Sequence, residues 1–102
     1  MTEAKLDTNR INFGKVAQDT ILRAELNIDN IGKEPLYLLN INPDCRCARY
    51  DYDKKIAQAG EKIKVILTID IKGKIGKEKI YSTMTINTLT KNYKLVVEAE
   101  IE

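Results

Sequence analysis

The sequence predicts an all-β protein, an immunoglobulin-like β-sandwich of about seven antiparallel strands in two sheets. Three observations support this class. Apolar residues recur at every second position in several segments, turn residues separate these segments at short intervals, and no window has the periodicity of an amphipathic helix. The 102 residues match the usual size of one domain, so we expect a single domain over residues 1–102. Its core should run from about residue 11 to residue 101, after an N-terminal extension of residues 1–10.

The clearest alternation runs from Lys62 to Lys72. Its aliphatic side chains fall on one face and its lysine, threonine and aspartate side chains on the other, with Ile66 as the exception. Strands of this kind bury one face in a core and leave the other in water. Six more strands are predicted: Ile11 to Val16, Leu22 to Ile28, Leu36 to Ile41, Ala48 to Tyr52, Ile80 to Ile86 and Tyr93 to Ile101.

These strands differ in how clearly they alternate. In Leu22 to Ile28 and in Tyr93 to Ile101, charged or amide side chains separate many of the apolar ones, and in Ile80 to Ile86 threonines do so. Leu36 to Ile41 is a nearly continuous apolar run, which is typical of a strand covered on both faces. We predict that the tyrosines pack in the core or across strands rather than forming a platform for a sugar.

The predicted turns are rich in Gly, Pro, Asn and Asp. Between the second and third strands lie Asn30, Gly32 and Pro35. We expect Gly32 to supply a positive φ, which glycine adopts without steric cost. Pro35 should open the next strand, where its missing N–H does least harm. The other turns are expected at Ala17 to Asp19, Asn42 to Asp44, Ala59 to Glu61, Gly73 to Gly76 and Asn87 to Asn92.

The composition removes several classes of function. There is no histidine, which excludes Ser-His-Asp and Cys-His catalysis and every zinc site that contains histidine. The formal net charge of +2 gives no indication of nucleic acid. No segment approaches the ~18 consecutive apolar residues of a membrane-spanning helix. We therefore predict a non-enzymatic protein with no catalytic residue and no bound cofactor.

One local cluster of charge is present, formed by Lys72, Lys74, Lys77 and Lys79 around two glycines. Such a cluster is typical of the solvated end of a hairpin. The alternative is a patch that binds phosphate or another polyanion. No aromatic residue is interleaved with the lysines to stack on bases, which argues against single-stranded nucleic acid.

The order of four motifs resembles a known family. Residues 11–16, Ile-Asn-Phe-Gly-Lys-Val, resemble its opening hydrophobic-x-Phe-Gly-x-Val strand, and residues 26–36 resemble its passage of apolar strand, Asn-x-Gly and Pro-Leu. Residues 44–48, Asp-Cys-Arg-Cys-Ala, stand where the family has Ser-Cys-Gly-Cys-Thr. Residues 56–61, Ile-Ala-Gln-Ala-Gly-Glu, stand where it has Ile-x-Pro-Gly-Glu. The family is Domain of Unknown Function 1573, a bacterial immunoglobulin-like group similar to ASH and major-sperm-protein-like modules.

This resemblance, from about Ile11 to Ile101, implies a β-sandwich without an established activity. It also implies export behind a Sec or lipoprotein leader, so we expect an extracytoplasmic protein, in the periplasm or at the cell surface. Composition alone fits a cytoplasmic protein equally well. Two positions depart from the motifs: Arg46 replaces a glycine and Ala59 a proline. We expect the loss of glycine at Arg46 to restrict the backbone of the Cys-x-Cys turn.

Cys45 and Cys47 are the sharpest chemical feature. On an extended strand their Cβ atoms would lie ~6.5–7 Å apart, whereas a disulfide needs about 3.8 Å, so an intrachain bond requires a tight turn. Such a bond is expected to be easily reduced. Four interpretations stay open: two reduced structural cysteines, a redox-active disulfide, a soft-metal site for Cu(I) or half a zinc site, and a bond to a partner protein. Cys45 and Cys47 are thus the candidate metal ligands, and a zinc site would need two more ligands from Asp, Glu or a second chain.

Together these observations predict a non-enzymatic extracytoplasmic protein-binding or structural module with an unknown protein partner. It would present loops or an edge strand, as in strand addition. Lys62 to Lys72 and Tyr93 to Ile101 are long enough to pair with a partner strand. The alternative is a thiol protein that uses Cys45 and Cys47 for redox chemistry or for binding Cu(I) or zinc.

Overall fold

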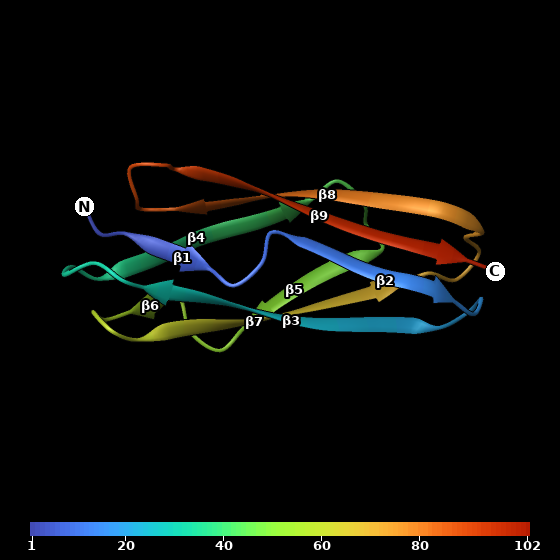
Figure 1. Cartoon of the computed structure of the whole chain (residues 1–102), viewed down its shortest axis with the longest axis horizontal. Helices are drawn as coiled ribbons and strands as arrows, with labels where there is room; N and C mark the ends of the chain where they lie inside the picture. The colour runs from blue at the N-terminus through green and yellow to red at the C-terminus, as the bar shows by residue number, and fades with distance from the viewer.

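The computed structural model describes residues 1–102 as two β-sheets packed face to face, in a molecule of 46 × 20 × 19 Å. Figure 1 shows the two layers edge-on, with the two ends of the chain at opposite ends of the long axis. The predicted all-β sandwich of two sheets is confirmed. No helix is long and apolar enough to cross a membrane. The strands are β1 (Ala4–Leu6), β2 (Arg10–Val16), β3 (Ile21–Asn30), β4 (Leu36–Pro43), β5 (Ala48–Tyr52), β6 (Ile56–Ala57), β7 (Lys62–Asp70), β8 (Gly76–Ile86) and β9 (Asn92–Ile101).

The strands form a four-stranded sheet of order β1-β3-β7-β5 and a five-stranded sheet of order β2-β9-β8-β4-β6. Neighbouring strands are antiparallel except for β2 and β9, which run parallel. The seven predicted strands correspond to β2 to β5 and β7 to β9. The structure adds β1, of three residues, and β6, of two. The N-terminal segment therefore contributes a strand to each sheet.

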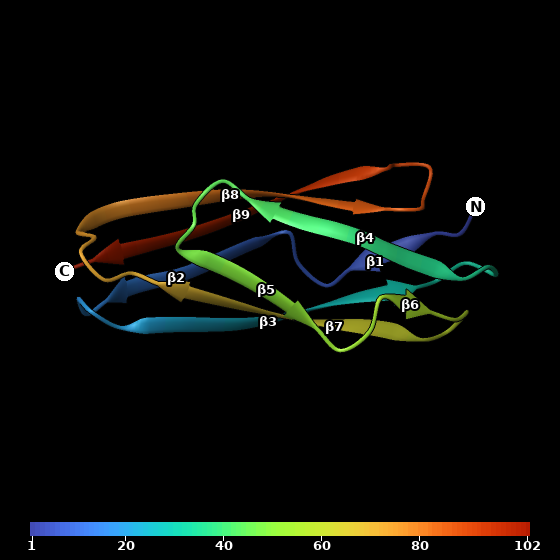
Figure 2. The same cartoon turned by 180° about the vertical axis from the view of Figure 1, so that it is seen from behind.

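Strand position decides which backbone groups remain open to a partner. β7 lies between β3 and β5, and β9 lies between β2 and β8. The expectation that these two strands would pair with a partner is therefore wrong. Since β6 pairs only with Leu36 and Tyr37, β4 has no neighbour on that side from Leu39 to Pro43. Figure 2 shows this side of the molecule, with β4, β5 and β6 toward the viewer.

The core forms between the two sheets, from the residues at alternate positions of each long strand. In β7 the inward side chains are essentially inaccessible to solvent, and the predicted alternation of this strand is confirmed. Burial of aliphatic side chains is the main favourable term in folding. Besides Ala48 and Ala57, the buried apolar residues are Leu22, Leu26, Ile28, Leu36, Leu38, Ile63, Val65, Leu67, Ile69, Ile71, Ile80, Met84, Ile86, Leu95, Val97 and Ile101.

β4 departs from its prediction. Leu36 and Leu38 are buried, but Tyr37 and Leu39 are 43 % and 53 % exposed, so the strand is covered on one face only. The continuous apolar run was misleading because its alternate members lie on the outer face of the five-stranded sheet. Tyr81 of β8 is also half exposed, whereas the other three tyrosines pack against the core.

The turn after β3 contains a glycine, Gly32, for a reason other than the predicted one. Glycines 14, 60, 73 and 76 have a positive φ, but Gly32 does not, so the prediction for Gly32 is wrong. A Cβ at this position would instead collide with Thr2 Oγ1 and with the backbone nitrogen of Glu3. Gly32 is therefore required by the close approach of the N-terminal strand rather than by its own conformation.

Candidate functional site

Cys45 and Cys47 form a disulfide in the turn that leads from β4 to β5. The backbone N–H of Ala48 donates to the carbonyl of Cys45 at 3.2 Å, which closes a β-turn over the two cysteines. Their Cα atoms are 5.2 Å apart, within the range that a disulfide spans. Of the four interpretations, only the one with a disulfide between the two cysteines contains the bond that the structure shows, and no cysteine is free.

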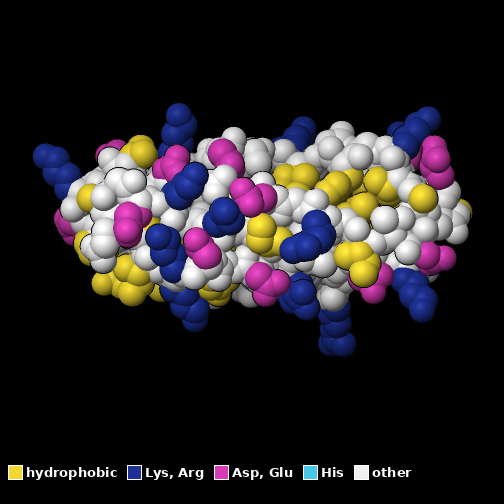
Figure 3. Space-filling model, turned by 90° about the horizontal axis from the view of Figure 1, so that it is seen from below, with side chains coloured by type: hydrophobic (Ala, Val, Ile, Leu, Met, Phe, Trp, Pro, Cys, Tyr) yellow, Lys and Arg dark blue, Asp and Glu magenta, His cyan; other side chains and the backbone are white.

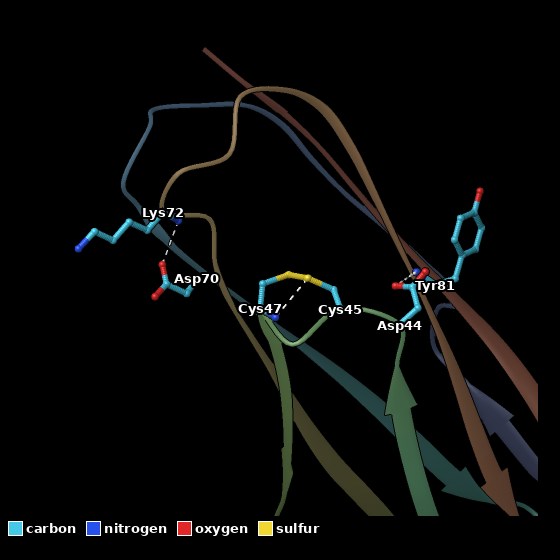
Figure 4. Close-up of a disulfide and its surroundings, with 6 residues drawn as sticks. All are labelled: Asp44, Cys45, Cys47, Asp70, Lys72 and Tyr81. Carbon is cyan, nitrogen blue, oxygen red and sulfur yellow. Dashed lines mark hydrogen bonds between the residues drawn. A yellow bond between two sulfur atoms is a disulfide. The ribbon is translucent and has the colours of Figure 1, made fainter.

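The turn is anchored to both sheets by hydrogen bonds that do not involve sulfur. The N–H of Asp44 donates to the carbonyl of Tyr81 at 2.8 Å, and the N–H of Tyr81 returns a bond to Asp44 Oδ1 at 3.1 Å. On the other side, the N–H of Asp70 donates to the carbonyl of Cys47 at 2.9 Å. Figure 4 shows the turn held between these neighbours.

Arg46 lies between the cysteines and is exposed. The one non-glycine residue with a positive φ is Asp19, so Arg46 sits in ordinary backbone space. The restriction expected from the loss of glycine therefore does not prevent the turn from forming. The family's glycine is not needed for the turn to form, and a long basic side chain is present at its tip instead.

The two sulfur atoms have different surroundings. The N–H of Cys47 donates to Sγ of Cys45 at 3.2 Å, and no hydrogen bond reaches Sγ of Cys47. Two acidic side chains lie near the turn in Figure 4, and each accepts a backbone N–H, Asp44 from Tyr81 and Asp70 from Lys72, the latter at 3.0 Å. These bonds partly offset negative charge that would otherwise disfavour a thiolate.

A metal needs thiolates, and a disulfide supplies none. In this state Cys45 and Cys47 cannot act as the ligands that the sequence offered for Cu(I) or zinc. No group of three or more cysteine, aspartate, glutamate or histidine side chains is placed to hold a metal ion elsewhere.

The four lysines of the cluster lie in two different elements: Lys77 and Lys79 are in β8, and Lys72 and Lys74 are in the turn that precedes it. Lys79 forms an ion pair with Glu98 at 3.5 Å, and Lys77 lies opposite Glu100 in the register. Lys72, Lys77 and Lys79 are exposed to solvent, as predicted. The prediction of a hairpin is wrong, because β7 and β8 lie in different sheets and the turn between them crosses from one sheet to the other. On the outer face of the other, four-stranded sheet, Figure 3 shows acidic and basic side chains interspersed.

A second surface follows from the open side of β4, and residues 39–43 are called the β4 edge below. Exposed apolar side chains lie at both of its ends. Tyr37 of β4 stands directly opposite Ile56 of β6, and Tyr81 of β8 lies next to Asp44 at the other end. The edge itself carries no charged side chain. Sequence reasoning missed this surface because it interpreted the apolar run as buried.

Two sheets packed face to face, with the N-terminal segment shared between them, define an immunoglobulin-like module. Solved structures with this fold include a protein of unknown function from Porphyromonas gingivalis W83 (TM-score 0.85, 16 % identity). The match covers 97 % of this chain but only 46 % of that protein, so this chain spans about half of its length. Others are PapD-like domain 7 of human CEP192, an ASH domain (TM-score 0.70, 11 % identity, 97 % of this chain and 84 % of that one), and WR4, a C. elegans MSP family member (TM-score 0.60, 12 % identity, 97 % of each chain). At these identities the likeness shows the fold alone.

The chain belongs to the family described as protein of unknown function (DUF1573), whose model matches residues 4–101. The family resemblance of the sequence is thereby confirmed. Among curated proteins, none matches the sequence.

Proposed function

We propose that this domain is a non-enzymatic protein-binding module that accepts an extended segment of a partner protein as an added strand at the β4 edge. The observation that carries the proposal is the open side of β4 from Leu39 to Pro43. Unpaired backbone groups on an edge strand are a template for another strand. Backbone hydrogen bonds then supply affinity, and neighbouring side chains supply specificity.

The other edges are less suited to this role. β1 and β6 have three and two residues, which is too short for a stable pairing. The exposed side chains of β5 include Arg49 and Asp51, which pair at 3.0 Å, and charges on an edge discourage strand addition. β2 is broken by an irregularity between Asn12 and Lys15. The β4 edge is uncharged from its own irregularity, between Leu38 and Asn40, to Pro43.

The exposed side chains beside the edge indicate the chemistry of the partner. Tyr37, Leu39 and Ile56 lie at one end of the edge, and Tyr81 of β8 lies across β4 at the other end. Tyrosine gives large contact area at low cost in conformational entropy, and it is enriched in protein interfaces. A partner segment with apolar side chains near both ends, and few charges between them, would match this surface.

We further propose that the domain acts outside the cytoplasm. Disulfides persist in oxidising compartments and are rare in the cytosol, and the Cys45–Cys47 bond supports such a location.

Site-specific crosslinking tests the binding proposal. A photoreactive residue is placed at Leu39 or at Tyr81, both exposed, and a matched one at Leu89, which is 87 % exposed in another turn. We expect Leu39 and Tyr81 to crosslink to the same partner segment in envelope extracts and Leu89 not to do so. A synthetic peptide of that segment should slow amide exchange in β4. Its affinity should fall at least about tenfold, or ~1.4 kcal/mol, for Leu39→Lys.

Two results would overturn the proposal. One is crosslinking from Leu39 and Leu89 to the same set of proteins, which indicates unspecific contact. The other is a peptide that binds without changing amide exchange between Leu39 and Asp44, because an added strand must protect that edge.

A further inference from the structure

We propose that the Cys45–Cys47 disulfide is a thiol–disulfide exchange site that oxidises a dithiol, with Cys47 as the attacked sulfur and Cys45 as the leaving thiolate. The proposal does not depend on the β4 edge, since it follows from the turn alone. The substrate class is a peptide or small molecule with two thiols.

Stability does not account for this disulfide. The bond joins residues two apart, and the loop-closure entropy that a disulfide removes from the unfolded chain decreases with loop length. The turn is already held without it, by the bonds from the N–H groups of Asp44, Tyr81, Ala48 and Asp70. Because the fold does not depend on this bond, the bond can be broken and formed again in a redox reaction.

The same anchors allow the dithiol form to keep its fold. Ala48, directly after the turn, is buried and pairs with Ile69 of β7. The carbonyl of Cys47 and the backbone of Asp44 remain tied to the two sheets whether or not the sulfurs are joined. Reduction therefore changes the sulfur atoms and leaves the sandwich in place.

The hydrogen bond from the N–H of Cys47 to Sγ of Cys45, at 3.2 Å, sets the direction of exchange. A backbone N–H stabilises negative charge on its acceptor, and a thiol that is more stable as thiolate leaves faster. Sγ of Cys47 has no such donor. An incoming thiolate therefore reacts with Cys47, and Cys45 leaves.

Arg46 supplies a positive charge beside the disulfide. It is exposed between the two cysteines, where it attracts a thiolate. The carboxylates of Asp44 and Asp70 are each bonded to a backbone N–H.

The exchange balances as two displacements. The first substrate thiolate bonds to Sγ of Cys47, the Cys45–Cys47 bond breaks, and Cys45 leaves as a thiolate. The second substrate thiolate attacks the substrate sulfur of this mixed disulfide and releases Cys47 as a thiolate. The substrate loses two electrons and two protons and becomes a disulfide. Cys45 and Cys47 take up these electrons and protons and become two thiols. A disulfide such as oxidised glutathione reverses the reaction.

Thiol counting by mass spectrometry in glutathione redox buffers tests the proposal. We expect protein kept in air to lack both thiols and to become half reduced within the range of these buffers. Its circular dichroism should be the same in both states and match that of the double variant Cys45→Ser, Cys47→Ser. After an acid quench, glutathione should be found on Cys47 in about tenfold excess over Cys45.

Arg46→Glu provides the test of the charge, since Arg46 is exposed and does not shape the turn. We expect reduction by glutathione to slow several-fold more than reduction by cysteamine, whose ammonium group offsets its thiolate. A disulfide that persists in every buffer, loss of the fold on reduction, thiols that stay free in oxidised glutathione, or glutathione mainly on Cys45 would each overturn the proposal.

Discussion

At the scale of single residues, Asn30 is the polar side chain on which one end of the sandwich depends. Asn30 is only 2 % exposed, and its side-chain amide uses both of its donors and both acceptor positions of its oxygen. Its Nδ2 group donates to the carbonyls of Glu34 and Ala57 at 2.7 and 2.9 Å. Its Oδ1 atom accepts from the hydroxyl of Thr2 and from the N–H of Gly32. One amide thereby joins β3, β6, the following turn and the N-terminus.

Asn30→Asp keeps the shape but removes both donors, so that a carboxylate faces two carbonyl oxygens. We expect the free energy of unfolding to fall by about 3 kcal/mol, measured by urea denaturation at pH 7. The matched control is Asn40→Asp on the exposed face of β4, which should change it by less than about 0.5 kcal/mol. Equal effects at the two positions would contradict this role.

The sequence predicted Asn30 and Gly32 as turn residues, but it gave no reason for Asn30 and a wrong one for Gly32. Asn-x-Gly is a turn pattern, and that part is local. The partners of Asn30 include Thr2 and Ala57, which are distant in the chain, and Gly32 is constrained by Thr2 and Glu3. Constraints of this kind arise only when the chain has folded.

At the scale of elements, the docking of β1 on β3 includes a close approach to Gly32. Ala4 pairs with Asn30 in the register, and the N–H groups of Ile31 and Gly32 both donate to the carbonyl of Glu3, at 2.9 and 3.2 Å. The missing side chain of Gly32 leaves the space in which Thr2 and Glu3 lie. Docking of the N-terminal strand therefore requires glycine at this position.

Gly32→Ala should displace β1 from β3. We expect a loss of about 1–3 kcal/mol in the free energy of unfolding and faster amide exchange at Ile31, whose acceptor moves away. Gly73→Ala is the matched control, because a Cβ there meets nothing within 4 Å but the φ of +80° is unfavourable for alanine. It should cost about 1 kcal/mol and leave exchange at Ile31 unchanged. Unchanged exchange at Ile31 in Gly32→Ala would show that β1 does not depend on this space.

Length and burial explain which elements the sequence predicts. The strands of five or more residues each correspond to a predicted segment. β1 and β6 are too short for an alternating pattern to be recognised. In β4 the run of apolar residues hid the alternation of buried Leu36 and Leu38 with exposed Tyr37 and Leu39. A hydrophobic pattern cannot distinguish a buried face from an exposed apolar one.

At the scale of the whole molecule, a hydrogen bond between the side chains of two facing strands joins the two sheets. The hydroxyl of Tyr50 on β5 donates to Ser82 Oγ on β8 at 2.8 Å. Burial raises the pKa of Tyr50 above its ordinary value, the bond to Ser82 partly offsets this, and the carboxylate of Asp44 adds to the increase. The sequence predicted two sheets, but it could not indicate this contact, since no pattern along one strand specifies its neighbour in the opposite sheet.

Because the pKa of Tyr50 is raised in the folded state, the free energy of unfolding depends on pH in the alkaline range. The unfolded chain loses the tyrosine proton near pH 10, while the folded chain keeps it to higher pH. The contribution of Tyr50 is therefore fully present below pH 10 and is lost as the pH rises through the folded pKa. Tyr50→Phe removes this dependence and leaves the buried Ser82 without its partner, so it should cost about 1 kcal/mol at pH 7.

We expect the difference in free energy of unfolding between the wild type and Tyr50→Phe to be constant from pH 7 to 9 and to narrow above pH 10, measured by urea denaturation at each pH. Tyr37→Phe, on the exposed face of β4, is the control and should follow the wild type throughout. Adding Ser82→Ala to Tyr50→Phe should cost less than Ser82→Ala alone, because the two hydroxyls act as a pair. A difference that is constant up to pH 11, or additive costs in the double variant, would mean that this bond does not couple the two sheets.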